Sequence, residues 1–275
     1  MTATDLRGRR DLGEIIGLSY RLYVANFAPL FLMALTVAPL QVLSAVVQDR
    51  IASVENQQLA ATAFLPFSVV VSLIATGALI HAVNDIATGT PPTFSRSIDA
   101  AFERFVALLA TNLLGGVLAI LSLLAFPYFA LRFVLTRKDP RMLYLSLLGF
   151  PYFAVRWTFS PQAVVIEGKR HWAALDISSS IVKGQWWRTF GMLVVITLIG
   201  TGPLLLARAV SLLPALPSSA ILAALVALTL PFLVAAQTLL YYDLRARKAA
   251  ADAPLPVLEP SPETEPGAGM GDGDQ

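Results

Sequence analysis

Six long runs of apolar residues constrain the fold of this chain more than any other feature of its sequence. A helix needs about 20 apolar residues to cross a bilayer core of about 30 Å. The runs are long enough, or nearly so, and the only charged residues within them are Arg132 and Arg156. The expected spans are 27–47, 60–81, 105–133, 142–159, 190–207 and 220–241.

Composition agrees with a membrane protein. Residues of the AVILMFWYC set make up 56% of the chain and charged residues 14%, whereas about 25% of a soluble domain is charged. The chain has no cysteine, and its net charge of +2 is too small to indicate a nucleic-acid partner. We therefore expect an all-α, polytopic bundle in contact with the lipid bilayer, with other membrane proteins as candidate partners.

Lys and Arg residues near the span ends predict the orientation, because cytoplasmic segments are enriched in them. With six spans and a cytoplasmic N-terminus, 13 of the 20 Lys and Arg residues lie in cytoplasmic segments and five lie outside. We therefore expect a cell-membrane protein with both termini in the cytoplasm. The turn at 136–141 is an exception, since it would place three cations outside.

Segments outside the spans divide the chain further. Residues 11–23 and 95–105 show apolar residues at helical spacing and predict amphipathic helices; the first is expected to lie in the membrane interface or to extend the first span. Residues 1–248 form the expected membrane domain. Residues 249–275 are rich in Pro, Gly and acidic residues, which predicts a disordered cytoplasmic tail.

A tandem repeat complicates the third and fourth spans. Residues 121–133 read LSLLAFPYFALRF and residues 145–157 read LSLLGFPYFAVRW, identical at ten of thirteen positions. Each copy has an Arg five residues after its Pro, which fits either a paired site on two helices or a tolerated duplication. The segment 121–160 either crosses the membrane twice or forms a re-entrant or surface element.

The longest polar stretch, 161–191, contains the candidate site residues. It begins with a β-prone run at 163–166, turns at Glu167-Gly168, and continues as a helix with an apolar stripe from Trp172 to Trp186. We expect this helix to lie on the cytoplasmic membrane surface, anchored by interfacial tryptophans. The candidate contacts to lipid headgroups or to the interface are Glu167, Lys183, Trp186, Trp187 and Arg188.

No motif with catalytic mechanics is present, and no carboxylate lies in the middle of a span. His81 and Asp85 stand four residues apart at the end of the second span, which could place two metal ligands on one helix face. Two ligands do not make a site, so the sequence predicts no catalytic residue, metal or cofactor, and no enzyme.

Several motifs resemble a broad group of bacterial multi-span proteins related to the membrane domain of glycerophosphoryl diester phosphodiesterase. They are Asp11-Leu12-Gly13-Glu14-Ile15-Ile16, Tyr20-Arg21-Leu22-Tyr23, Val164-Val165-Ile166-Glu167-Gly168, Val182-Lys183-Gly184, Trp186-Trp187-Arg188-Thr189-Phe190-Gly191 and Tyr241-Tyr242-Asp243-Leu244-Arg245. The resemblance covers about 12–248 and implies a six-helix membrane module. In the fused enzymes, catalysis belongs to a separate soluble barrel that nothing here fits, so the activity is not carried over.

Two functions remain open from the sequence. The first is a non-enzymatic membrane module that acts as an accessory or scaffold for a membrane complex. The alternative is a transporter or permease component for a small or lipid-like molecule. Polar residues converging on one cavity would favour the alternative, whereas tight packing without a cavity would favour the scaffold.

Overall fold

A computed structural model describes residues 8–40, 42, 43, 47, 54–136, 141–210 and 218–253, and every regular element in these residues is an α-helix. The all-α prediction is therefore confirmed for this part of the chain. The helices are α1 (Leu12–Ala25), α2 (Phe27–Leu35), α4 (Val54–Ala87), α5 (Phe94–Glu103), α6 (Phe105–Thr136), α7 (Arg141–Trp157), α8 (Ser160–Glu167), α9 (His171–Val182), α10 (Trp186–Val210) and α11 (Ser218–Asp252).

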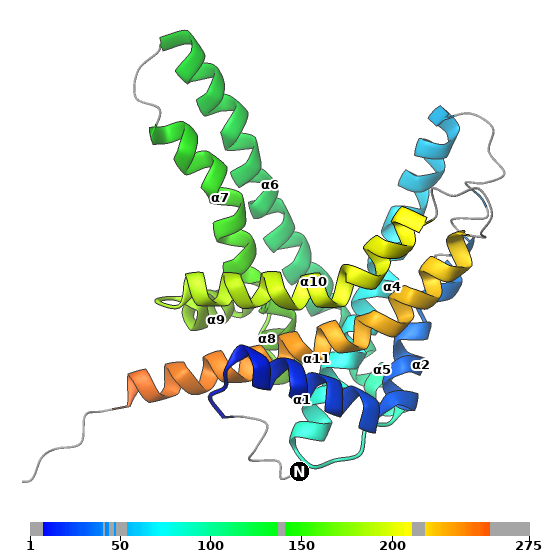
Figure 1. Cartoon of the computed structure of the whole chain (residues 1–275). Coiled ribbons are helices and arrows are strands. Elements are labelled where there is room, and N and C mark those ends of the chain that lie inside the picture. The colour runs from blue at the N-terminus through cyan, green and yellow to red at the C-terminus, as the bar shows by residue number, and fades with distance from the viewer. Residues whose placement is uncertain are drawn as a thin grey trace, which may run out of the picture.

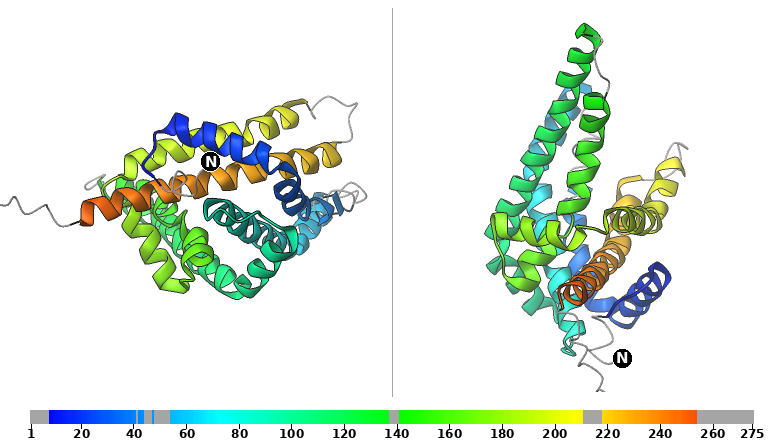
Figure 2. Two further views of the ribbon diagram at one scale, coloured as in Figure 1. Left: turned by 90° about the horizontal axis from the view of Figure 1, so that it is seen from below. Right: turned by 90° about the vertical axis from the view of Figure 1, so that its left-hand side faces the viewer.

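Two groups of helices rise from a common body to the same side (Figure 1). The hairpin of α6 and α7 rises at the upper left, and parts of α4, α10 and α11 rise at the upper right. The right-hand view in Figure 2 shows the same hairpin projecting beyond the rest of the molecule. The helices α1, α5, α8 and α9 belong to the body, and α11 packs there against α1, α2, α4 and α10.

Helix α11 joins two parts of the apolar core. Val234 and Ala235 pack in one group with residues of α2, α4, α6 and α8. Leu239 and Leu240 pack in a second group with residues of α1, α7, α9 and α10. A helix buried on more than one side needs apolar residues around its whole circumference, and the long apolar run of α11 supplies them.

Hydropathy locates the helices well. Four expected spans lie within single helices: 60–81 in α4, 105–133 in α6, 190–207 in α10 and 220–241 in α11. Helix α11 continues to Asp252 and so includes the first four residues of the tail expected from 249. The predicted disorder falls on 254–275, which lies outside the described residues.

Fewer helices than expected qualify as spans. Within the described residues, two are long and apolar enough to cross a membrane, in Thr62–Ala87 and Ala224–Asp252, and up to four if each bent helix pair is one span. Six were expected. Helix α7 has 17 residues, or about 26 Å at 1.5 Å per residue, which is less than a bilayer core, and Arg156 lies in its last turn. The expected span 27–47 lies partly outside the described residues.

The two amphipathic segments form separate helices that meet the following helix at a sharp bend. The break between α1 and α2 at Asn26 is 89°, and the break between α5 and α6 at Arg104 is 59°. The Asn26 side-chain amide donates a hydrogen bond to the carbonyl of Leu22 at 3.1 Å, which satisfies an acceptor at the end of α1. Helix α1 is thus not a straight extension of the first expected span.

Two predictions for the segment between α7 and α10 are wrong, and one is confirmed. The β-prone run at 163–166 lies in helix α8, which has Pro161 in its first turn, where the missing N–H costs no hydrogen bond. The expected turn is confirmed at Gly168, whose φ of 67° ends α8 in the left-handed region. The prediction of one helix with an apolar stripe from Trp172 to Trp186 is wrong. Gly184, with φ of 81°, lies between α9 and α10, so Trp172 and Trp186 belong to different helices.

The two repeat copies lie on the antiparallel helices of the α6–α7 hairpin (Figure 1). Arg132 lies one turn before α6 ends at Thr136, and Arg156 lies at the opposite end of α7 from Arg141. Fifteen residues of helix separate Arg141 from Arg156, which corresponds to about 22 Å. The antiparallel arrangement therefore places the two repeat arginines near opposite ends of the hairpin, and they do not form a paired site.

Candidate functional site

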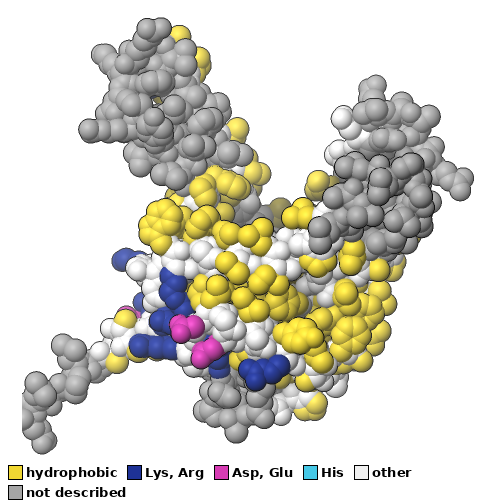
Figure 3. Space-filling model, in the orientation of Figure 1, with side chains coloured by type: hydrophobic (Ala, Val, Ile, Leu, Met, Phe, Trp, Pro, Cys, Tyr) yellow, Lys and Arg dark blue, Asp and Glu magenta, His cyan; other side chains and the backbone are white. Residues whose placement is uncertain are grey.

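Charged side chains gather at one end of the molecule. Figure 3 shows Lys, Arg, Asp and Glu side chains at the lower left, near the last part of α11, whereas apolar side chains cover much of the described surface above and to the right. Charged residues from different helices bond to one another in this region. These contacts form the best-defined polar site in the described part of the chain.

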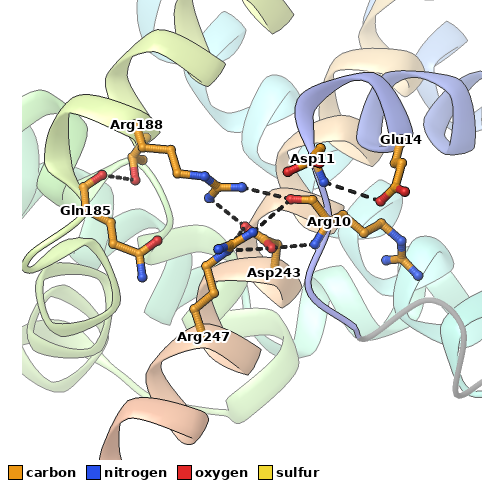
Figure 4. Close-up of polar contacts among 8 residues, drawn as sticks. Arg10, Asp11, Glu14, Gln185, Arg188, Asp243 and Arg247 are labelled. Atoms are coloured by element: carbon orange, nitrogen blue, oxygen red, sulfur yellow. Dashed lines mark hydrogen bonds and ion pairs between the residues drawn. The ribbon is translucent and has the colours of Figure 1, made fainter.

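The centre of this site is Asp243, whose side chain is fully buried in α11. Its carboxylate accepts a hydrogen bond from the Arg188 guanidinium of α10 at 2.7 Å and from the Arg247 Nε at 2.9 Å (Figure 4). The backbone N–H of Arg10 is a third donor, at 2.7 Å. Two guanidinium groups and one amide dipole therefore compensate this buried negative charge.

The same two guanidinium groups also hold the N-terminal segment. The carbonyl oxygen of Arg10 accepts a hydrogen bond from Arg188 at 2.8 Å and another from Arg247 at 3.1 Å. Because Arg10 lies two residues before α1, next to its N-cap residue Asp11, these bonds fix the start of α1 against α10 and α11. We refer to Arg10, Arg188, Asp243 and Arg247 as the Asp243 network.

A second group of contacts lies on the neighbouring residues of α11. Buried Tyr241 donates a hydrogen bond from its hydroxyl to Glu167 at the end of α8. Arg245 forms an ion pair with the same carboxylate at 2.8 Å. The hydroxyl of Tyr242 donates to Asn84 Oδ1 of α4 at 2.8 Å. Neighbouring residues of α11 thus bind both α8 and α4.

These second contacts border an open cavity of about 810 Å³ between α4, α8 and α11. Its volume is in the range of small-molecule pockets. The polar residues that line it are Asn84, Glu167, Tyr241, Tyr242, Arg245, Lys248 and Asp252. Polar groups from three helices therefore converge on one hollow, which is the arrangement that the sequence alone could not show.

The His81–Asp85 pair has a different role from the metal site considered above. Asp85 binds Arg96 of α5 at 2.7 Å, and His81 Nδ1 lies 3.4 Å from the same carboxylate oxygen. In the part of the chain that the structure describes, no group of three His, Cys, Asp or Glu side chains could hold a metal ion. The Asp85–Arg96 ion pair joins the end of α4 to α5.

The structure does not bring the predicted site residues together in one site. Glu167 and Arg188 bind different residues of α11, Glu167 to Arg245 and Arg188 to Asp243. Lys183 is exposed where α9 ends. Their role at lipid headgroups stays a prediction.

The two predicted tryptophans lie at the start of α10 in an aromatic cluster. Trp186 stacks on Phe190 at 5.2 Å between ring centroids and on Tyr152 of α7 at 6.1 Å. Its indole N–H donates to the Tyr152 carbonyl at 3.2 Å. Trp187 packs edge-on against Trp186 and is 75% exposed. We call Tyr152, Phe153, Trp157, Trp186, Trp187 and Phe190 the aromatic cluster.

Sequence reasoning missed the binding partners on α11. Asp243 and Tyr242 were noted only as parts of a motif, and nothing pointed to Arg10 as the partner of Asp243 or to Asn84 as the partner of Tyr242. A signal for Asp243 was present, since it is a lone carboxylate directly after a long apolar run. Arg247 stands four residues after it on the same helix, but its partners on other segments lie 55 and 233 positions away in the chain, so spacing could not identify them.

No family model, curated protein or solved structure matches this chain. The resemblance to the membrane domain of glycerophosphoryl diester phosphodiesterase therefore stays a prediction from the motifs. Two of those motifs, Trp186-Trp187-Arg188 and Tyr241-Tyr242-Asp243, meet in space through the Arg188–Asp243 ion pair.

Proposed function

We propose that this chain is a multi-pass, non-enzymatic membrane module that supports a membrane complex as an accessory or scaffold. In this proposal the apolar helices form six crossings, and both termini lie in the cytoplasm. The 13-to-5 distribution of Lys and Arg supports that orientation.

The Asp243 network is the main observation in favour of this role. Its charged groups are bonded to one another and to the backbone of the N-terminal segment, so they serve to position α1, α10 and α11. A rigid polar end combined with a long apolar hairpin suits a module that holds neighbouring proteins in the bilayer. Exposed apolar side chains along the hairpin include Leu113, Val117, Leu124, Leu131 and Leu135.

Site-specific cross-linking in cells tests the scaffold role. A photoreactive residue at Leu124 or Leu131, each 59% exposed on the hairpin, should yield one protein adduct of defined mass. The matched control is Tyr20 of α1, which is 61% exposed but lies outside the hairpin. Adducts to lipid alone from both hairpin positions, with a single chain after purification in mild detergent, would contradict the proposal.

Polar groups converge on the cavity between α4, α8 and α11, which favours a second candidate, a transporter or permease component for a small or lipid-like molecule. It stays second because polar groups in the cavity lining already bond to one another. Binding sites of such proteins gather a few polar groups in a hollow between helices. The test is flux of a short-chain fluorescent lipid across vesicles that contain the purified protein. Protein-dependent flux that falls in Tyr242→Phe, but not in Tyr20→Phe, would support this candidate over the scaffold.

A further inference from the structure

A second pocket, separate from the Asp243 network and from the large cavity, lies between the end of α7 and α9. It has a volume of about 520 Å³ and is open to the surface. Its lining includes one cation, one anion and two indoles, contributed by Arg156, Trp157, Trp172 and Asp176. None of these four residues belongs to the Asp243 network or lines the large cavity. One of them, Trp157, is part of the aromatic cluster.

The aromatic cluster marks the level of this pocket relative to a bilayer. Trp and Tyr side chains prefer the headgroup region, where an apolar ring and a polar group are both satisfied. Trp157 stacks on Phe153 at 4.8 Å and lines the pocket, and Trp172 is 62% exposed on its other side. The pocket therefore opens at headgroup depth if the chain lies in a membrane.

The cation of the pocket is held in place without being neutralised. Arg156 Nη1 donates a hydrogen bond to the hydroxyl of Tyr152 at 2.9 Å, and the guanidinium lies 5.3 Å from the centroid of that ring. Neither contact supplies a negative charge. A guanidinium group retains further N–H donors in a planar fork that suits a phosphate.

The anion of the pocket is Asp176 of α9, which is exposed and forms no ion pair with Arg156 or with another described residue. A cation and an anion thus line one pocket without pairing with each other. A ligand that carries both charges complements this arrangement better than a ligand with one charge. Phospholipids with an ammonium group beyond the phosphate have this charge order.

We propose that this pocket binds the headgroup of a zwitterionic aminophospholipid, with the phosphate at Arg156 and the ammonium at Asp176. The indoles of Trp157 and Trp172 border the glycerol region. The acyl chains follow the apolar surface of α7, where Phe150 and Tyr152 are 40% and 42% exposed. This inference rests on the proposed membrane location but not on the scaffold role.

Lipid retention by the full-length protein tests the pocket. The protein is purified in mild detergent, incubated with phosphatidylethanolamine and phosphatidylglycerol of the same acyl chains, and examined by native mass spectrometry. We expect Arg156→Gln to weaken retention of both lipids by about tenfold, because both lose a charge-assisted hydrogen bond to phosphate. We expect Asp176→Asn to weaken retention of phosphatidylethanolamine alone.

The repeat supplies a matched control, since Arg132 occupies in the first copy the position that Arg156 occupies in the second. Arg132→Gln removes the same charge from the other end of the hairpin and should leave retention unchanged. Soluble glycerophosphoethanolamine in excess should compete with the lipid if the headgroup is recognised, whereas no competition would assign retention to the acyl chains and overturn the proposal.

Two further results would also overturn the proposal. One is equal retention of the two lipids by the unaltered protein, and the other is an equal loss of both lipids in Asp176→Asn. If Arg156→Gln does not fold, Asp176→Asn still decides, because its side chain is exposed. A partner protein found by cross-linking would leave this outcome unaffected, so the two proposals can fail separately.

Discussion

Arg188 and Asp243 are 55 positions apart in the chain, and their side chains meet at 2.7 Å where the Asp243 carboxylate is fully buried. This ion pair joins the start of α10 to the end of the apolar part of α11. It also sets the position of Arg188, which holds the Arg10 carbonyl at 2.8 Å. One buried carboxylate thereby organises the N-terminal segment and two long helices.

Replacing that carboxylate should destabilise the fold strongly. Asp243→Asn keeps the size of the side chain but leaves Arg188 and Arg247 without a buried counter-charge. Breaking a buried ion pair by removing one partner costs about 3–5 kcal/mol. Thermal unfolding in detergent should show a much lower midpoint for Asp243→Asn. The control is Asp99→Asn, whose exposed carboxylate accepts one hydrogen bond from Ser95 at 3.3 Å and whose loss should cost little.

The N-terminal segment should stabilise the fold through its backbone, at the N–H of Arg10. Arg10→Pro removes the N–H that donates to Asp243 at 2.7 Å, whereas Arg10→Ala retains it. We therefore expect the proline variant to be less stable than the alanine variant by about 1.5–3 kcal/mol, the range for a hydrogen bond to a charged group. Equal unfolding midpoints for the two variants would show that this bond does not stabilise α1.

The predictable part of the fold is the part that depends on local sequence. Apolar runs locate α4, α6, α10 and α11, because a helix that packs in an apolar environment must itself be apolar. The turn at Gly168 is equally local, since a positive φ favours glycine. The run at 163–166 is misread because β-branched residues indicate only a packed apolar position when the run is short.

The Asp243 network and the open cavity were not predictable for a physical reason. The contacts of Asp243 and Tyr241 join residues 55, 74 and 233 positions apart, and no periodicity in one helix specifies its partner in another. Glu167 and Arg188 were recognised as polar residues of interest, but their partners on α11 are set by the tertiary packing. The sequence therefore identified Glu167 and Arg188 as candidate site residues but did not identify the residues of α11 that they bind.

Close packing between α10 and α11 should make Gly200 sensitive to a single methyl group. A Cβ built at Gly200 would clash with the side chain of Leu233, whereas a Cβ at Gly202 meets nothing within 4 Å. Gly200→Ala should therefore lower stability by about 1–3 kcal/mol, as overpacking does. Gly202→Ala on the same helix is the matched control and should be neutral or slightly stabilising. If the clash is the cause, Leu233→Ala should restore part of the stability that Gly200→Ala removes.

The last prediction concerns the sidedness of the α6–α7 hairpin. Residues 137–140 lie outside the described residues, but α6 ends at Thr136 and α7 begins at Arg141, so Lys138 belongs to the connection between them. If both helices cross the membrane, this connection lies outside despite its cations. The positive-inside rule is statistical, and the basic flanks Arg104 and Lys169-Arg170 can impose that orientation on the pair.

Because the chain has no cysteine, single substitutions report this sidedness directly. Lys138→Cys should react with a membrane-impermeant maleimide on intact cells, as expected for an external loop. Lys183→Cys, at an exposed position where α9 ends, should react only after permeabilisation. Protection of Lys138→Cys in intact cells, with labelling after permeabilisation, would place the connection in the cytoplasm. The two repeat copies would then be re-entrant or surface helices, and the six-span topology would be wrong.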